Sequence, residues 1–301
     1  MWPVPGAGVT SALEIGYAAL ASRIVVRTIA AGPADGPPVV LLHGWGCSAF
    51  LFRDNLPALG RAGFRAIAID LKGHGLSDKP ESEDAYTLDA MTSHVLEVLD
   101  ALALSRAALV GQSMGGRIAL EVARRAPGRV RRLALIAPVG IGEFRAWPLL
   151  RLGGWRALEP LAPRLVTRGI VRLVLNIVAG NRRPITADAV EGYYAPMQYA
   201  EFPRVLQQLL REFTWEPVTS ELLHAIGVPI LVVVGTRDMI LRIAPDRPLL
   251  RERAGMRVVW VEGAGHAPNE ECPDDVNRAL IEFLRDPSGG CSAVELPPPT
   301  P

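Results

Sequence analysis

A glycine-framed serine between a strand pattern and a helix pattern constrains the fold of this chain more than any other feature. Residues 111–116 are Gly-Gln-Ser-Met-Gly-Gly. The apolar residues 107–110 before them predict a short buried strand, and residues 117–123 after them predict a helix. In so tight a Gly-x-Ser-x-Gly turn, the residues two before and two after the serine must be small, and both are glycine here. The sequence therefore predicts a strand, a strained turn and a helix around Ser113.

This predicted turn, a nucleophile elbow, gives Ser113 the setting of a nucleophile. It directs the hydroxyl into a cleft, while amides at the start of the next helix face developing negative charge. A serine needs a base to react at neutral pH, and the base needs an orienting carboxylate. Asp238 follows the strand pattern at 229–235, and His266 follows the strand pattern at 257–261. We predict Asp238 as the orienting acid and His266 as the base.

Strand and helix patterns alternate along most of the chain. Strands are expected at 23–30, 39–42, 65–70, 107–110, 133–136, 229–235 and 257–261, with 23–30 at the edge of the sheet, and helices at 51–62, 87–103, 117–123 and 273–285. This alternation predicts an α/β fold, in which a mostly parallel central sheet is flanked by helices. In such sheets the active site lies beyond the carboxyl ends of the strands.

The alternation stops at about residue 140. Residues 140–216 show no clear strand pattern and indicate several helices, interrupted by glycine and proline. We predict that residues 1–139 and 217–287 form the two parts of one core α/β domain. Residues 140–216 would be a helical cap inserted between them, and residues 288–301 a disordered tail.

The predicted cap has two compositional features. The first is a cluster of four aromatic residues and a methionine, Tyr193, Tyr194, Met197, Tyr199 and Phe202. This cluster either shapes a substrate pocket or packs the cap onto the core. Between residues 143 and 183 there are eight arginines and two acidic residues, a local net charge of +6. The arginines are at positions 145, 151, 156, 164, 168, 172, 182 and 183, and apolar residues between them include Trp147, Leu149, Leu150, Leu152 and Trp155. The segment is either a solvated helical face or a basic lid that attracts acidic substrates or an anionic lipid surface.

Four motifs occur in an informative order. They are His-Gly-Trp-Gly at 43–46, Gly-His-Gly-Leu-Ser-Asp at 73–78, the elbow, and Asp238 with His266. With them the chain resembles an α/β-hydrolase fold protein with an inserted cap, over about residues 23–285. The resemblance implies that the backbone amides of Trp45 and Met114 form the oxyanion hole. One such donor contributes roughly 3–4 kcal/mol of transition-state stabilisation.

The serine also bears on the reaction. It favours ester hydrolysis through an acyl-enzyme, whereas relatives that open epoxides or displace halide have aspartate at this position. A carbon–carbon bond hydrolase of ring-cleavage products is an alternative, although such relatives have Gly-Asn-Ser-Met-Gly-Gly and a tryptophan after the histidine, where this chain has Gln112 and Ala267. Lactone, amide and perhydrolase chemistry would use the same residues as ester hydrolysis, and a low-turnover small-molecule receptor would keep them too.

His43, His74 and Asp70 are interpreted as structural. His94, within an expected helix, and His224, just before an expected strand, are interpreted as having no role in the function. Glu143, just after the strand expected at 133–136, is the next candidate for the acid if Asp238 does not fill that role.

Composition limits the partners and the compartment. The net charge of +1 gives no indication of nucleic-acid binding. Three widely spaced cysteines, at 47, 272 and 291, form neither a disulfide framework nor a metal-ligand pattern. The N-terminus lacks the basic region of a signal peptide, and no apolar stretch reaches 18 residues. We expect a cytoplasmic protein that acts on a small molecule without a metal or cofactor.

Overall fold

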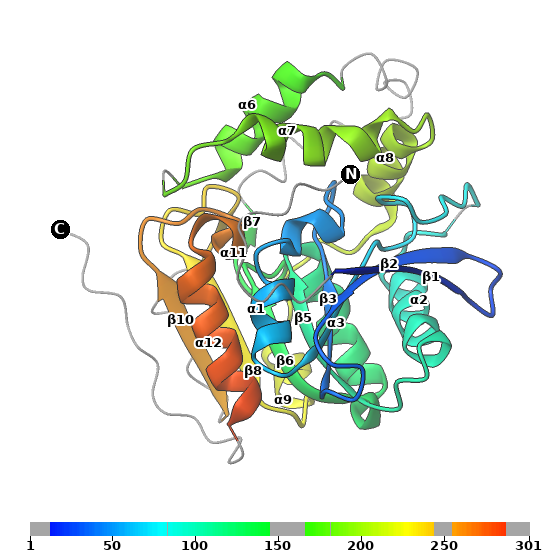
Figure 1. The fold of residues 1–301 in the computed structure, drawn as a ribbon, viewed down its shortest axis with the longest axis vertical. Coiled ribbons are helices and arrows are strands. Elements are labelled where there is room, and N and C mark those ends of the chain that lie inside the picture. Colours follow the sequence, from blue (N-terminus) through cyan, green and yellow to red (C-terminus); the bar gives the residue numbers. More distant parts are fainter. Residues whose placement is uncertain (1–12, 83, 145–165, 181, 244–254, 287–301) are drawn as a thin grey trace.

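A mostly parallel sheet forms the centre of the molecule (Figure 1). The computed structural model describes residues 13–82, 84–144, 166–180, 182–243 and 255–286. Within these ranges eight strands form one sheet in the order β1-β2-β4-β3-β5-β6-β8-β10. The strands are β1 (Glu14–Ala19), β2 (Val25–Ala31), β3 (Pro38–Leu42), β4 (Arg65–Ile69), β5 (Ala107–Gln112), β6 (Val130–Ile136), β8 (Ile230–Gly235) and β10 (Met256–Val261). From β4 to β10 in this order all neighbours are parallel, which confirms the predicted α/β sheet.

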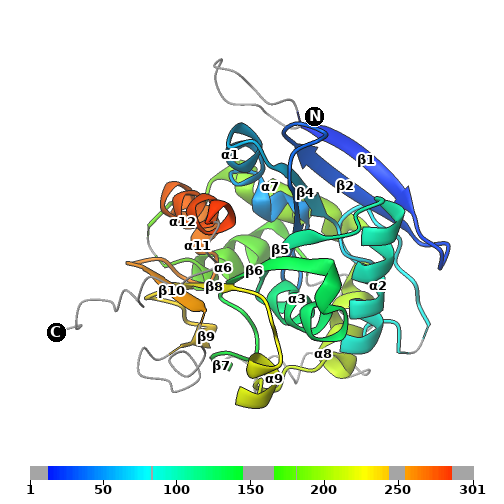
Figure 2. The same cartoon turned by 90° about the horizontal axis from the view of Figure 1, so that it is seen from below.

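Helices cover both faces of the sheet (Figure 2). They are η1 (Ala49–Phe52), α1 (Leu56–Arg61), α2 (Leu88–Ala101), α3 (Met114–Arg125), η2 (Pro127–Arg129), α9 (Ser220–His224), α11 (Pro268–Glu271) and α12 (Pro273–Arg285). Alternate residues of each strand face opposite layers. Val40 and Leu42 join the core under α2 and α3, whereas Val39 and Leu41 join the core under α1 and α12. Two covered faces explain why the central strands are continuously apolar.

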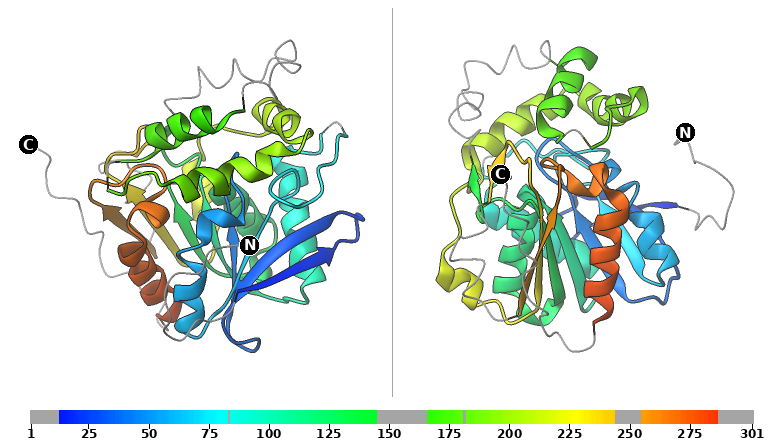
Figure 3. Two further views of the ribbon diagram at one scale, coloured as in Figure 1. Left: turned by 45° about the horizontal axis from the view of Figure 1, so that its top comes forward. Right: turned by 90° about the vertical axis from the view of Figure 1, so that its left-hand side faces the viewer.

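A further set of helices lies across the carboxyl ends of the parallel strands (Figures 1 and 3). We call residues 166–212 the helical layer; it contains α6 (Arg168–Val178), α7 (Ala187–Tyr194), η4 (Ala195–Gln198) and α8 (Phe202–Glu212). Threonine hydroxyls at positions 167 and 186 accept hydrogen bonds from the first turns of α6 and α7, so the sequence itself marks where both helices begin. Residues 145–165 of the predicted cap are outside the described residues, and the division into domains stays a prediction.

The prediction that residues 23–30 form an edge strand was wrong. The strand is β2, and it lies between β1 and β4, antiparallel to both. The edge is β1, whose side chains at Ile15 and Tyr17 are largely exposed. Its sequence, Glu-Ile-Gly-Tyr-Ala-Ala, lacks the run of β-branched residues that signals a strand, so the pattern gave no warning of it.

Two further expectations needed correction. The helix predicted at 51–62 is divided into η1 and α1, because Pro57 has no N–H and is tolerated only in the first turn of a helix. Within 140–216, where no strand was expected, β7 (Glu143–Phe144) pairs antiparallel with β9 (Leu241–Arg242). Strands of two residues are too short to show an alternating pattern.

Candidate active site

The elbow joins β5 to α3 at Ser113. Its φ of 51° and ψ of −114° place it in a region that side chains rarely adopt. A Cβ at Gly111 would collide with the backbone of Gly115, and one at Gly115 would collide with the carbonyl of Leu42. The Ser113 N–H donates to the Ile136 carbonyl at 2.9 Å, which ties the turn to β6. Small residues and neighbouring strands together hold the strained serine in place.

Ser113 is hydrogen-bonded to His266, which lies 153 residues further along the chain. His266 Nε2 lies 3.0 Å from Ser113 Oγ, and His266 Nδ1 lies 2.8 Å from Asp238 Oδ2. The other oxygen, Asp238 Oδ1, accepts hydrogen bonds from the N–H groups of Ile240 and Leu241, both at 2.8 Å. These two bonds aim Oδ2 at the imidazole. The arrangement matches the geometry in which a histidine accepts a hydroxyl proton while a carboxylate fixes its tautomer.

The two predicted oxyanion-hole residues flank the serine. Met114 is the first residue of α3, so its N–H has no acceptor within the helix. Trp45 follows β3, and a Cβ on the neighbouring Gly44 would lie 3.1 Å from Ser113 Cβ, which shows how closely this loop approaches the elbow. In the described part of the chain neither amide donates to a backbone carbonyl. The Trp45 indole N–H donates to the Leu206 carbonyl at 3.0 Å and so ties the loop to α8.

The residues interpreted as structural make contacts that brace the loops at the ends of β3 and β4. The ring of His43 accepts the Leu71 N–H at 3.0 Å and packs edge-on against His74, with ring centres 4.9 Å apart. Asp70 accepts the N–H groups of Ala49 and Leu76. Burial lowers the pKa of His43 and of His74, which keeps both rings neutral.

Three other residues that the sequence analysis considered, His94, His224 and Glu143, lie outside these contacts. His94 accepts the Lys72 N–H at 3.0 Å. His224 is exposed on α9. Glu143 is exposed in β7, and the carboxylate that contacts His266 belongs to Asp238.

Sequence reasoning missed two side chains beside the histidine. Gln112 Nε2 donates to the His266 carbonyl at 3.0 Å. Glu271 is buried and accepts the Gly265 N–H at 2.9 Å, next to His266 in the chain. A buried polar residue at the end of an apolar strand, and an acid five residues after the histidine, were the available signals. The Gln112 contact spans 154 residues, and Glu271 also accepts the N–H of Gly180, 91 residues away, so neither role could be predicted from local sequence.

A cavity of about 870 Å³ lies between the helical layer and η1 and α11. Its lining includes Phe50, Val178, Ile185, Tyr193 and Ala267, with several charged side chains; Ser113, Asp238 and His266 are not part of the lining. Ala267 is adjacent to the histidine in the chain. The cavity therefore lies next to the loop that carries His266, but the three hydrogen-bonded residues of the candidate site do not line it.

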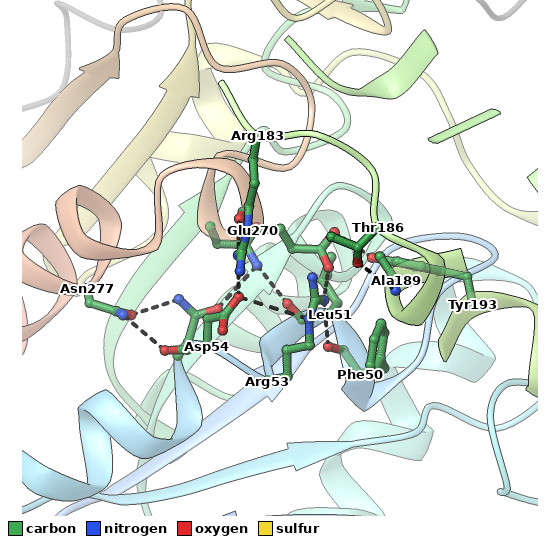
Figure 4. A network of polar contacts seen from close by, with 12 residues as sticks. Phe50, Leu51, Arg53, Asp54, Arg183, Thr186, Ala189, Tyr193, Glu270 and Asn277 are labelled. Carbon is green, nitrogen blue, oxygen red and sulfur yellow. Dashed lines mark hydrogen bonds and ion pairs between the residues drawn. The ribbon is translucent and has the colours of Figure 1, made fainter. Parts of the chain in front are cut away.

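A polar network forms one wall of this cavity (Figure 4). Glu270 is ion-paired to Arg53 and accepts a hydrogen bond of 2.6 Å from the Tyr193 hydroxyl. Arg183 pairs with Asp54 at 2.8 Å. Burial raises the pKa of the Tyr193 hydroxyl and of the Glu270 carboxyl. The network fastens α7 and the loop before it to the core.

The two features of the predicted cap have different outcomes. Tyr193 and Phe202 are buried in the packing of the helical layer, whereas Tyr199 is exposed. Of the arginines, 145, 151, 156 and 164 are outside the described residues, as are Trp147, Leu149, Leu150, Leu152 and Trp155. Arg168 is ion-paired with Glu191, so part of the positive charge is compensated.

Neither a membrane-spanning helix nor a metal-binding cluster occurs among the described residues. No helix in these ranges is both long and apolar enough to cross a membrane. No group of three or more histidine, cysteine, aspartate or glutamate side chains in the same ranges is arranged to hold a metal ion.

The chain is similar to known proteins in both sequence and structure. A family model described as the alpha/beta hydrolase family matches residues 39–279. A haloalkane dehalogenase of Mycobacterium marinum is 32% identical over 74% of this chain and 76% of its own length. Epoxide hydrolase A of Mycobacterium tuberculosis is 26% identical over 86% of this chain and 94% of its own. The structure of a meta-cleavage product hydrolase from Pseudomonas fluorescens superposes with a TM-score of 0.75 and 25% identity, covering 90% of this chain and 97% of that one. The chain belongs to the alpha/beta hydrolase family.

Proposed function

We propose that the protein is a serine hydrolase that cleaves a carboxylic ester of a small or medium-sized substrate through an acyl-enzyme. The observation that carries the proposal is the hydrogen-bonded series from Ser113 through His266 to Asp238, with contacts of 3.0 and 2.8 Å. A serine in this setting is activated toward carbonyl carbon.

The chemistry of the nucleophile separates this proposal from the activities named for the sequence relatives. Displacement at a saturated carbon by an aspartate yields an alkyl ester, which water then cleaves at the carbonyl carbon. The same attack by Ser113 would yield an ether, which water does not cleave. A serine nucleophile turns over when it attacks an acyl group, because the acyl-enzyme is itself an ester. This argument disfavours dehalogenation and epoxide opening.

The proposed reaction has two halves. Ser113 Oγ attacks the ester carbonyl while His266 Nε2 takes the hydroxyl proton, and the amides of Trp45 and Met114 bind the oxyanion. The tetrahedral intermediate collapses, and His266 gives the proton to the leaving alcohol. Water then attacks the acyl-enzyme, His266 takes a proton from the water and returns it to Ser113, and the acid is released. Asp238 keeps Nε2 free to accept the proton in both halves.

A substrate panel tests the proposal. Purified protein is assayed on p-nitrophenyl acetate and butyrate, a lactone, an anilide, a chloroalkane and an epoxide. We expect turnover of the esters that Ser113→Ala abolishes, while Ser105→Ala, which changes an exposed serine, retains it. Turnover of the chloroalkane or epoxide with no turnover of any acyl substrate would overturn the proposal. A single turnover without a second would favour a low-turnover small-molecule receptor.

Carbon–carbon bond hydrolysis is the second candidate, because the solved meta-cleavage product hydrolase covers nearly the full chain at 25% identity. Gln112, whose side chain binds the His266 carbonyl, replaces the asparagine of that class. Including a dienone ring-cleavage product in the panel separates the two: kcat/KM for the dienone well above that for the esters would favour this candidate.

We also propose that residues 140–216 act as a cap and that this cap contacts anionic lipid. The support is one face of α6, where large apolar side chains are 46–54% exposed; they are Ile170, Leu173, Val174 and Ile177. The same helix carries the exposed Arg168 and Arg172. Sedimentation with vesicles of anionic or neutral phospholipid tests the contact. We expect binding to anionic vesicles that high salt weakens and that Leu173→Ser reduces; no binding to either would contradict it.

The cytoplasm is the compartment that we propose. Cys47 and Cys272 are free thiols, as a reducing environment allows. Fractionation of the native cells would test this assignment, and recovery in the periplasm or the culture medium would contradict it.

A further inference from the structure

The loop that carries His266 is enclosed by backbone on two sides. A Cβ at Gly235, the end of β8, would collide with the carbonyl of Gly265. A Cβ at Gly180, just after α6, would collide with the N–H of the same Gly265. The His266 N–H donates to the Val178 carbonyl at 2.9 Å. The loop is therefore held between the core sheet and the end of the first helix of the helical layer.

One carboxylate joins these two pieces of backbone. Glu271 Oε1 accepts the Gly265 N–H at 2.9 Å, and Glu271 Oε2 accepts the Gly180 N–H at 2.6 Å. The residue is only 8% exposed, and burial raises the pKa of its carboxyl. Both amides are buried, so without Glu271 each would lack its acceptor. The contact with Gly180 reaches 91 positions back in the chain and joins the end of α6 to the loop that carries His266.

The neighbouring carboxylate points elsewhere. Glu270 lies in the same short helix, but its side chain binds Arg53 and Tyr193 in the network of Figure 4. Adjacent residues thus have separate tasks: Glu270 fastens α7 to the core, and Glu271 fastens the histidine loop to the end of α6. A general need for charge on this helix would not explain why the Glu271 carboxylate accepts hydrogen bonds from backbone amides, whereas Glu270 pairs with an arginine.

We propose that Glu271 is a positioning residue for His266, which holds the imidazole in line between Ser113 and Asp238 by fixing the backbone of Gly265 against Gly180. The proposal rests on the proposed function to the extent that His266 is the base. Misplacing a reacting group by about 1 Å costs on the order of 100-fold in rate. We therefore expect Glu271→Ala to lower kcat by about that factor and to change KM less than about threefold.

Three variants make the test specific. Glu271→Ala removes both acceptors. Glu271→Gln keeps the length of the side chain and one carbonyl oxygen, so it should recover part of the lost rate. Asp275→Asn changes an exposed acid four residues further along and serves as the matched control. Circular dichroism and thermal unfolding of each variant establish that it is folded at the assay temperature.

The first readout is kinetic, with a p-nitrophenyl ester as substrate. A folded Glu271→Ala protein with kcat within about threefold of wild type would overturn the proposal. A rise of KM by about 100-fold with no change in kcat would also overturn the proposal, because that pattern indicates a role in substrate binding. If Glu271→Ala does not fold, Glu271→Gln decides: kcat equal to wild type overturns the proposal, and a reduced kcat with unchanged KM supports it.

The second readout needs no substrate. Proton NMR detects the hydrogen-bonded Nδ1 proton between His266 and Asp238 as a downfield resonance, assigned by its loss in His266→Ala. We expect this resonance to broaden or move in Glu271→Ala and to stay unchanged in Asp275→Asn. An unmoved resonance in folded Glu271→Ala overturns the proposal even if wild type cleaves no ester, so failure of this inference and failure of the proposed function can be told apart.

Discussion

Acid should destabilise this protein through its buried histidines, and His94 allows the effect to be measured. The residue is 3% exposed, and its Nε2 accepts the Lys72 N–H at 3.0 Å. Burial, with smaller contributions from Lys72 and His43, lowers the pKa of His94 to about 3 from 6.5. Below pH 6.5 the unfolded chain therefore binds a proton at His94 that the folded chain excludes until about pH 3.

The sign and size follow from linkage. Because the unfolded state binds more protons in this range, stability falls as pH falls from 6.5 toward 3, and His94 adds no slope well above 6.5. One pKa unit corresponds to about 1.4 kcal/mol, so lowering the pH to about 5 removes about 2 kcal/mol from the free energy of unfolding through His94 alone. His43 and His74, whose pKa values burial also lowers, add to the loss in the same direction.

Urea unfolding between about pH 7.5 and about pH 5 measures the effect. In His94→Gln the amide oxygen can still accept the Lys72 N–H, but the residue no longer titrates. We expect its free energy of unfolding to fall by about 2 kcal/mol less than that of wild type over this range. His224→Gln, on the surface of α9, is the matched control and should retain the wild-type dependence. Equal slopes for His94→Gln and wild type would refute the reasoning.

Three further predictions address the site and its supports. If His266 is the base, Asp238→Asn should lower kcat by about 10⁴ while KM changes little, because the imidazole loses its correct tautomer. A near-normal kcat in steady-state kinetics would show that another residue orients the imidazole. Gly115→Ala should lower the free energy of unfolding by about 2 kcal/mol or more, since the new Cβ meets the carbonyl of Leu42, and a urea midpoint equal to wild type would contradict that packing. Glu270→Ala should cost about 3 kcal/mol in urea unfolding because Arg53 loses its partly buried partner; a loss below about 1 kcal/mol would show that the pair is effectively solvated.

The features that the sequence predicted well are those with local causes. The glycines around Ser113 are required by the tight turn itself, so the turn could be placed without knowing the rest of the fold. The apolar strands are continuous because the sheet is covered on both faces, and this confirmed the α/β class. Asp238 and His266 were paired because each follows a strand whose carboxyl end meets the same edge; the structure brings them together with Ser113, and their roles stay predictions.

The features that the sequence did not reveal depend on distant contacts. The strand β1 is held by pairing with β2 and has little propensity of its own. The roles of Glu271 and Gln112 could not be predicted, because each side chain is hydrogen-bonded to backbone that is remote in the chain. Nothing in the residues around Glu271 distinguishes it from Glu270, although the two carboxylates face different partners.

Covalent labelling of Ser113 tests the central claim most directly. A fluorophosphonate reacts with a serine that is activated as a nucleophile and leaves a stable adduct, which peptide mass spectrometry can locate. We predict one adduct, on the peptide that contains Ser113, formed at a rate that His266→Ala lowers by orders of magnitude. We expect the Ser113→Ala variant to form no adduct and to hydrolyse no p-nitrophenyl ester. Labelling at another serine, or ester turnover that survives in Ser113→Ala, would contradict the account.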